Sequence, residues 1–434
     1  MRKTVFAAII ALLAVTCLAF AGGTPEPKAA AGGKVTLSMY AYNERTNPVE
    51  APNWDYALGI FRATNPDVDL QIEFGFTEPY HDKMKIMVAA NQIPDLMFLW
   101  PDKRTGYLTE KGLAKDLTPY VKGHEKEFVP GALAPQIAGG LWEIPEQVTD
   151  CHVVYTNTKL LKQLGLTYPK TFEEMVKQAP AILAKGLIPV AMDDKDGWQM
   201  QSCLLGALIE RTGGKAWFDK AIKGKEGKFT DPEFVNALSV IETMAKNKML
   251  SPGIVQADYG VAVTDFANEK AVYMIDGGWR VNALVGVVKP EQKKDIELNT
   301  FPDLAGMKGT PGSTSSVVGT GYGMSASLTG AKAEAAWKWI WFYAGPVDSA
   351  IRQGFGANPA YILPKRTDLD PLILKLIDFV NKTPGGYVVD SVLDADGMKV
   401  IQPAMQELIL GSKTAQQVAA EFEKWVAAND SGRK

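Results

Sequence analysis

Three tryptophans of this sequence stand where a side chain could reach a ligand. Trp279 follows a predicted strand, residues 272–275, and a turn that contains Gly278, so its indole should emerge at the end of the strand. Trp198 stands at a predicted helix start, and Trp100 ends another predicted strand. An indole ring can cover the flat C–H face of a ring-shaped polyol. Because most aromatic residues build cores, position alone makes these three the candidates.

Polar side chains at similar places complete the candidate set. They are Asn43, Glu44, Asp102, Gln147, Asp150, Arg280 and Tyr322. Planar groups with two donors or acceptors suit neighbouring hydroxyls, and an ionised carboxylate accepts stronger hydrogen bonds than a neutral group. Tyr322 lies in residues 319–323 (GTGYG), which could bring backbone N–H groups near a ligand. The alternative for each carboxylate is an ordinary solvated loop charge.

The sequence lacks the spacing of common catalytic, metal and nucleotide sites. Its three cysteines and three histidines form no CxxC or HExxH pattern, so no metal site is predicted. No histidine has a nucleophile or carboxylate at a motif spacing, and His81 is expected on the surface of a helix. The glycines of residues 319–323 precede an extended stretch instead of a helix, which makes a dinucleotide site a poor match. We therefore predict no catalytic residue and no cofactor.

Composition narrows the class of protein. The chain has 434 residues, 46 Lys and Arg against 49 Asp and Glu, and a formal net charge of -3. Its length suits two or more domains with full cores. The near balance of charge argues against nucleic-acid binding, since phosphate recognition normally needs a basic excess.

The N-terminus has the layout of a secretory signal peptide. Arg2 and Lys3 precede an uncharged apolar run over residues 5–18, which ends in a small-x-small pattern closed by Ala21. The run is short for a membrane-spanning helix. Residues 1–21 are therefore predicted to be a cleaved export signal, which implies a periplasmic protein.

The cysteines add two open questions about the exported form. Cys17 could instead be the lipid-modified first residue of a lipoprotein, although Thr16 before it fits a lipobox poorly. Residues 22–33, rich in Pro, Ala and Gly, are predicted to be a linker. Cys151 and Cys203 could pair in an oxidising compartment, but their apolar flanks also fit two ordinary buried thiols.

The first part of the mature chain alternates strands and helices. The predicted elements are residues 35–42, 54–64, 69–76, 80–90 and 95–100. This order is typical of a parallel α/β sheet, whose ligands gather at the carboxyl ends of the strands. The segments expected on that rim are 43–45, 76–78 and 100–102.

A second α/β unit follows a boundary within residues 141–150. Its predicted elements are residues 151–156, 171–185, 187–192, 197–211 and 272–275. Further helices are predicted at residues 331–343, 371–381, 404–410 and 415–427. In the first of these, helical spacing puts Trp337 and Trp341 on one face, predicted to be core, with Trp339 partly exposed.

The order of four segments resembles the bacterial extracellular solute-binding proteins of family 1, which serve ABC importers and include the maltose-binding protein. The segments are YHDKMKIMVAANQIPDLMFLW, GLWEIPEQVTDCHVVYTNTKLLKQLGLTYPKTFEEM, EKAVYMIDGGWRVNAL and GYGMSASLTGAKAEAAWKWIWFYAGPVDSAIRQGFGANPA. The resemblance implies two α/β lobes joined by a hinge of crossing strands, with a ligand cleft between them. One lobe would hold residues 34–147 and 310–356, and the other residues 148–309 and 357–434.

The resemblance also implies a function. Such a protein is a monomer that closes around a sugar or an oligosaccharide and presents it to a membrane permease, without catalysis. Trp279 occupies a GxW-like position that commonly stacks on the ligand in this family. Arg280 would be either a fork that binds hydroxyls or an ion pair that bridges the lobes.

Three alternatives stay open from the residues themselves. A secreted carbohydrate-processing enzyme also uses an aromatic cleft with paired carboxylates, although no motif here marks such a pair. The same fold could bind a polyol phosphate, which needs more basic groups than Arg45 and Arg280 supply. It could also bind a polyamine, which needs more carboxylates.

Overall fold

The computed structural model describes residues 33–47, 50–136, 139–223, 226–393 and 395–429. The predicted signal peptide, Cys17 and linker residues 22–32 lie outside these ranges. None of the helices within the described ranges has the length and apolar composition needed to span a bilayer.

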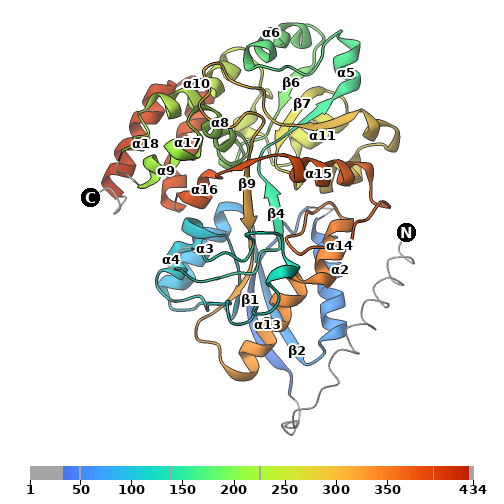
Figure 1. Cartoon of the computed structure of the whole chain (residues 1–434), viewed down its shortest axis with the longest axis vertical. Coiled ribbons are helices and arrows are strands. Elements are labelled where there is room, and N and C mark those ends of the chain that lie inside the picture. Colours follow the sequence, from blue (N-terminus) through green and yellow to red (C-terminus); the bar gives the residue numbers. More distant parts are fainter. Residues whose placement is uncertain (1–32, 48–49, 137–138, 224–225, 394, 430–434) are drawn as a thin grey trace.

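The first lobe is built on a sheet with strand order β10-β3-β1-β2. Strands β1 (Val35–Tyr42), β2 (Val68–Gly75) and β3 (Leu96–Leu99) are parallel, as predicted, and β10 (Gly321–Met324) joins β3 in antiparallel register. The main helices of this lobe are α2 (Glu50–Thr64), α3 (Thr77–Ala89), α13 (Gly330–Ala344) and α14 (Pro346–Gly354). These elements form the lower body in Figure 1.

The second lobe has a sheet with strand order β6-β7-β5-β8. Its strands are β5 (Val153–Asn157), β6 (Ile188–Ala191), β7 (Ala271–Asp276) and β8 (Ile296–Asn299). The helices from its central part of the chain are α5 (Thr158–Gln163), α6 (Phe172–Leu183), α7 (Trp198–Met200), α8 (Gly206–Thr212), α9 (Gly214–Lys223), α10 (Pro232–Lys246), α11 (Val261–Ala267) and α12 (Arg280–Val287). Its C-terminal helices are α15 (Pro371–Lys382), α16 (Val389–Val392), α17 (Ala395–Ile409) and α18 (Ala415–Asn429).

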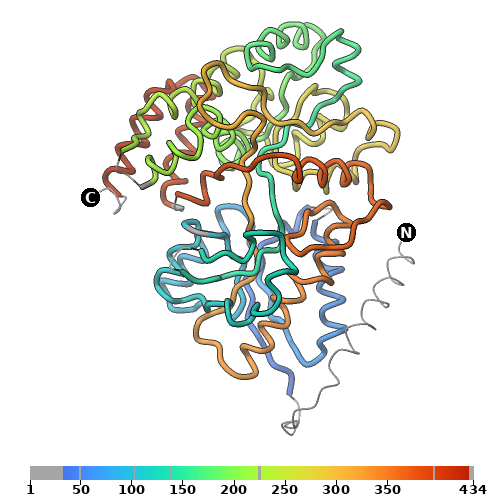
Figure 2. The backbone as a smooth tube through the Cα atoms, in the orientation of Figure 1, coloured from blue at the N-terminus to red at the C-terminus, as the bar shows by residue number. Residues whose placement is uncertain are grey.

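Two crossing strands lie between the lobes. They are β4 (Gln147–Asp150) and β9 (Thr314–Gly319), which pair antiparallel, with β11 (Gly385–Gly386) added to β9. The chain contributes to the two cores in turn. Buried core residues up to Ile144 belong to the first lobe, and those from Val153 to Leu304 belong to the second. The chain then returns to the first core and leaves it again after Ala360, so it crosses between the lobes three times (Figure 2). The fold is thus two α/β lobes joined by crossing strands.

The prediction for the tryptophans of α13 is wrong. Trp339 is 0% exposed and packs 5.0 Å from the Phe61 ring and 5.4 Å from the Tyr322 ring, whereas Trp337 and Trp341 are only half-buried. Helical spacing separates the two faces correctly, but it does not say which face the sheet covers. The helix predicted at residues 404–410 is longer than predicted, because α17 starts at Ala395 and continues through Pro403.

Candidate ligand-binding cleft

A cavity of about 320 Å³ lies between the two lobes. Both lobes and the crossing strands contribute to its wall. The residues of the first lobe are Tyr42, Asn43, Glu50, Phe76, His81, Trp100 and Arg104. Those of the crossing strands are Gln147, Thr149 and Val317, and those of the second lobe are Trp198, Ser202, Tyr259, Trp279 and Asp390. Pockets of this size that combine aromatic rings with a few polar groups are typical of small-molecule sites.

Three rings of the second lobe form one side of the cavity, and we call Trp198, Tyr259 and Trp279 the aromatic plate. The Trp198 ring lies 5.1 Å from Tyr259 and 6.0 Å from Trp279, measured between centroids. The indole Nε1 of Trp279 donates to the Tyr259 hydroxyl at 2.8 Å. The Trp279 ring folds back over Gly277, where a Cβ atom would overlap it, so the turn after β7 requires glycine there.

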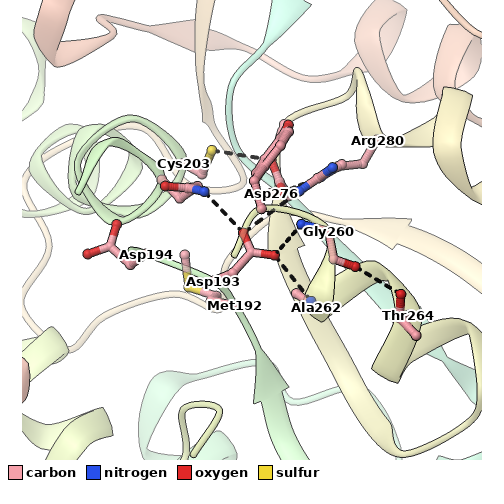
Figure 3. A network of polar contacts seen from close by, with 12 residues as sticks. Met192, Asp193, Asp194, Cys203, Gly260, Ala262, Thr264, Asp276 and Arg280 are labelled. Atoms are coloured by element: carbon pink, nitrogen blue, oxygen red, sulfur yellow. Dashed lines mark hydrogen bonds and ion pairs between the residues drawn. The ribbon is translucent and has the colours of Figure 1, made fainter. Parts of the chain in front are cut away.

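Arg280, which contacts Tyr259 of the plate, is the centre of a buried ion-pair network. Figure 3 shows this network. The Nε of Arg280 donates to Asp276 at 2.6 Å, and its Nη2 lies 3.7 Å from Asp193. The Arg280 side chain is 4% exposed and that of Asp193 is 1% exposed. Both partners of Arg280 belong to the second lobe, so the ion pair does not bridge the lobes. Arg280 also does not line the cavity.

The same network fixes the loop that carries Tyr259. The Asp193 carboxylate accepts from the backbone N–H groups of Gly260 at 2.9 Å and Ala262 at 3.1 Å. The Arg280 guanidinium lies 3.3 Å from the centre of the Tyr259 ring. Burial raises the pKa of Asp193 to about 6, against the lowering effect of Arg280. The plate is therefore held by contacts within its own lobe.

The opposite side of the cavity is also aromatic. The Tyr42 ring lies 4.8 Å from Trp100 and 4.9 Å from Phe76, and the Phe76 ring faces Tyr259 of the other lobe at 6.3 Å. A ring-shaped ligand placed here would have aromatic groups on both sides.

His81 belongs to this first-lobe wall, and the prediction that it lies on the surface is wrong. It is 3% exposed, and its ring lies 4.6 Å from Trp100. Burial, with a smaller effect of Arg104, lowers the pKa of His81 well below its usual value. Its spacing of three from Met84, itself buried, is the sequence signal that could have placed it on the inner face of α3.

Charged side chains on the wall were missed by sequence reasoning. Arg104, in the short helix η1 (Asp102–Thr105), bonds Glu78 at 2.6 Å. Burial raises the pKa of Glu50 to about 7, and burial also raises the pKa of Asp390, which lies in α16 of the other lobe. Nothing in their local sequence marks these residues, because the contacts join distant segments.

A further ion-pair network ties the hinge. Arg352 of α14 bonds Asp348 at 2.9 Å and lies 3.1 Å from Glu146, which directly precedes β4. Glu146 also accepts from the Thr320 hydroxyl at 3.2 Å, next to β9. Burial raises the pKa of Asp348 to about 7. Two of the crossings are thus bonded to each other at the edge of the cavity.

The structure brings five of the sequence-predicted site residues to the cavity. They are Asn43, Trp100, Gln147, Trp198 and Trp279. Asn43 and Trp100 follow β1 and β3, Gln147 opens β4, and the two others belong to the aromatic plate. Their shared wall position is the geometry that a ligand-binding role requires.

Four more predicted residues, like Arg280, do not line the cavity: Glu44, Asp150, Gly278 and Tyr322. Glu44 bonds the Thr46 hydroxyl at 3.2 Å and is not on the wall. Asp150 is buried, its pKa is raised to about 7 by that burial, and its backbone carbonyl accepts from Gly278 at 2.7 Å. Tyr322 is 1% exposed and lies in the core of the first lobe, with its ring 4.8 Å from Tyr343.

Asp102 and the two cysteines do not contribute to the cavity wall in the described part of the structure. The side chain of Asp102 lies outside the described part of the structure, and its backbone begins helix η1. Cys151 and Cys203 are both buried free thiols. Among the described side chains, no cluster of three or more His, Cys, Asp or Glu residues could hold a metal ion.

Comparison with known proteins gives one family and one fold. The family described as bacterial extracellular solute-binding protein matches residues 42–349. A multiple sugar-binding protein of Streptococcus mutans is 26% identical over 50% of this chain and 51% of its own length. The chain thus aligns with about half the length of the curated relatives that it matches.

Solved structures resemble the whole described molecule. A chitin oligosaccharide binding protein has a TM-score of 0.82 at 24% identity, covering 92% of this chain and 99% of its own. A protein from work on xylan utilization by the thermophilic bacterium Caldanaerobius polysaccharolyticus has a TM-score of 0.81 at 21% identity, covering 90% and 100%. At these identities the likeness shows the fold.

Proposed function

Because the chain belongs to the bacterial extracellular solute-binding protein family, we propose that it captures a sugar or an oligosaccharide between its lobes and delivers it to the permease of an ABC importer. One observation carries the proposal: aromatic rings from both lobes line a single cavity, and Phe76 of the first lobe contacts Tyr259 of the second at 6.3 Å between ring centroids. A ligand would therefore lie beside this pair, against the other rings of the wall. Sugar rings present flat C–H faces to such side chains and hydroxyls to the polar groups between them.

The charges on the cavity wall favour an uncharged ligand. Arg104 is paired with Glu78, and Arg352 with both Glu146 and Asp348. A phosphate would need a cation without a carboxylate partner, and both wall arginines already have one. The carboxylates of Glu50 and Asp390, which also line the wall, are suited to accept hydrogen bonds from hydroxyls.

Several finer features belong to the same proposal. The protein is a binding component without catalytic activity, and it works as a monomer. It is exported by residues 1–21 to the periplasm, either free or anchored through Cys17. The lobes comprise residues 34–147 with 310–360 and residues 148–309 with 361–434, where the segment 310–356 expected from the sequence is extended because Ala360 packs in the first core. The family description and the charge pattern of the N-terminus support export.

The test is calorimetric titration with a panel of mono- and oligosaccharides, using Trp279→Ala and a matched control. Loss of one stacked ring should weaken binding more than tenfold, since such contacts contribute about 1–3 kcal/mol. Trp425→Ala removes a half-buried indole of the same lobe that is not on the cavity wall, and it should leave affinity unchanged. Absence of heat with every saccharide, or turnover of chromogenic glycosides, would contradict the proposal.

A further inference from the structure

Two helices beside the cleft carry the same short charge pattern. Helix α3 of the first lobe has Asp82 and Lys85, and α17 of the second lobe has Asp396 and Lys399. In each helix the acid precedes the base by three residues, so both charges lie on one helical face.

The two patterns pair reciprocally across the lobes. Lys85 Nζ lies 2.7 Å from Asp396 Oδ1, and Lys399 Nζ lies 2.6 Å from Asp82 Oδ1. The partners lie on helices of different lobes, so these contacts exist only while the lobes are together. Each carboxylate meets a lysine of the opposite lobe.

These four residues stand next to the cavity without lining it. Helix α3 contributes Glu78 and His81 to the wall, and α16, which immediately precedes α17, contributes Asp390. The charge of Arg104 acts on both Glu78 and Asp390. Separating α3 from α17 therefore opens the wall at this point as well as breaking the two ion pairs.

We propose that Asp82, Lys85, Asp396 and Lys399 form an interlobe clasp that stabilises the closed protein and so sets ligand affinity without touching the ligand. The statement about affinity rests on the proposed function, whereas the clasp itself does not. The four are positioning residues, because they act through the closure of the lobes.

The clasp makes capture of a neutral ligand sensitive to salt. Apparent affinity scales with the population of the binding-competent conformation, which the clasp raises. The clasp side chains are partly exposed, so ions screen the pairs over about 10 Å at 0.1 M salt. A neutral saccharide should therefore bind more weakly as salt increases, although the ligand carries no charge.

Charge swaps test this at constant net charge. The double substitution Asp82→Lys with Lys85→Asp changes α3 alone. It places two positive charges together at one ion pair and two negative charges at the other, so it should weaken saccharide binding about fivefold to fiftyfold at low salt. Adding Asp396→Lys and Lys399→Asp on α17 restores opposite charges and should return affinity to within about twofold. Asp378→Lys with Lys382→Asp, a swap within α15, is the matched control and should change nothing.

A zero-length carbodiimide provides a readout that needs no ligand, because it joins contacting lysine and aspartate side chains as amides. Mass spectrometry of the wild type should find peptides that link α3 to α17. Their yield should fall with salt and in the α3 swap, and recover in the double swap. If no saccharide binds any variant, the proposed function fails and this yield still decides the clasp. Absence of the linked peptides from the wild type, or an α3 swap that binds saccharide like the wild type, would overturn the inference.

Discussion

Replacing Arg280 with methionine should destabilise the protein, because its guanidinium neutralises two carboxylates that are shielded from water. Arg280 contacts Asp276 at 2.6 Å and Asp193 at 3.7 Å, and no side chain of the three is more than 4% exposed. Removing one partner of a buried ion pair costs about 3–5 kcal/mol, since the remaining charge stays buried. Methionine keeps the apolar stem, so we expect the free energy of unfolding to fall by about 4 kcal/mol at pH 8.

The loss should shrink in acid. Burial holds the pKa of Asp193 at about 6 even with Arg280 present, and removal of the cation raises it further. The unfolded chain has an ordinary aspartate pKa of about 3.9. A carboxyl whose folded pKa is raised is stable while protonated, and the penalty develops as pH rises through the folded pKa. The penalty of Arg280→Met is therefore smaller at pH 5 than at pH 8.

Urea unfolding of Arg280→Met and the wild type at pH 5 and pH 8 measures both quantities. Arg45→Met is the matched control, since Arg45 forms an exposed pair with Asp55 at 2.7 Å and should lose less than about 1 kcal/mol at either pH. A loss below about 1 kcal/mol for Arg280→Met at pH 8 would refute the role of the buried network. Equal losses at the two pH values would show that lost packing, and not the uncompensated charge, explains the effect.

Two further predictions follow from burial. Trp339→Ala should lower the free energy of unfolding by about 3–5 kcal/mol, because the ring is fully buried. Trp337→Ala on the same helix should lower it by about 1 kcal/mol, because that ring is only half-buried. Equal losses in chemical denaturation would contradict the conclusion that the Trp339 face of α13 is the buried one. Saccharide affinity should rise between pH 6 and pH 8, because Glu50, whose pKa is about 7, ionises over this range and becomes a stronger hydrogen-bond acceptor. Glu50→Gln should remove this pH dependence. A wild-type titration series without the rise would argue against Glu50 as a hydroxyl acceptor.

The sequence predicts best those site residues that follow parallel strands. Asn43 and Trp100 lie on the cavity wall because β1 and β3 are parallel and therefore end at the same edge of the sheet. Trp279 reaches the wall for a related reason, since the glycines after β7 let the chain turn sharply at the strand end. For these three residues, the predicted strand and the rule that ligands gather at strand ends are sufficient to predict a position on the cavity wall.

The sequence pattern does not show which face of a helix is buried by the rest of the protein. Trp339 and Tyr322 pack together because α13 lies against β10, a strand that joins the first sheet only after the chain has passed through the second lobe. Spacing assigned Trp339 to the face opposite Trp337 and could not say more. His81 was misplaced for a related reason. Its spacing from Met84 shows that the two residues share a face of α3, but only contacts such as that with Trp100 show that this face is buried.

Tyr259, a wall residue on a loop, was not predictable from the sequence. Tyr259 lies between the short helix η5 (Ile254–Gln256) and α11, with no strand end or capping motif to mark it. Its position comes from Asp193 and Arg280, which are distant in sequence from each other and from the loop. Such sites are set by tertiary contacts, which a single sequence does not display.

The aromatic plate is fixed by contacts within its own lobe, whereas the opposite wall approaches it only when the lobes close. This difference determines the order in which ligand stacking and closure occur. Every contact that fixes the aromatic plate, from the Trp279–Tyr259 hydrogen bond to the Arg280 network, lies within the second lobe. The plate therefore keeps its geometry when the lobes separate, and a ligand can stack on it at little ordering cost. Phe76 and Trp100 lie across the cavity from the plate only when the lobes meet, which is also when the proposed α3–α17 clasp forms. Stacking on the plate should thus precede closure, and the first-lobe wall should contribute to affinity only to the extent that the hinge and the clasp favour the closed form.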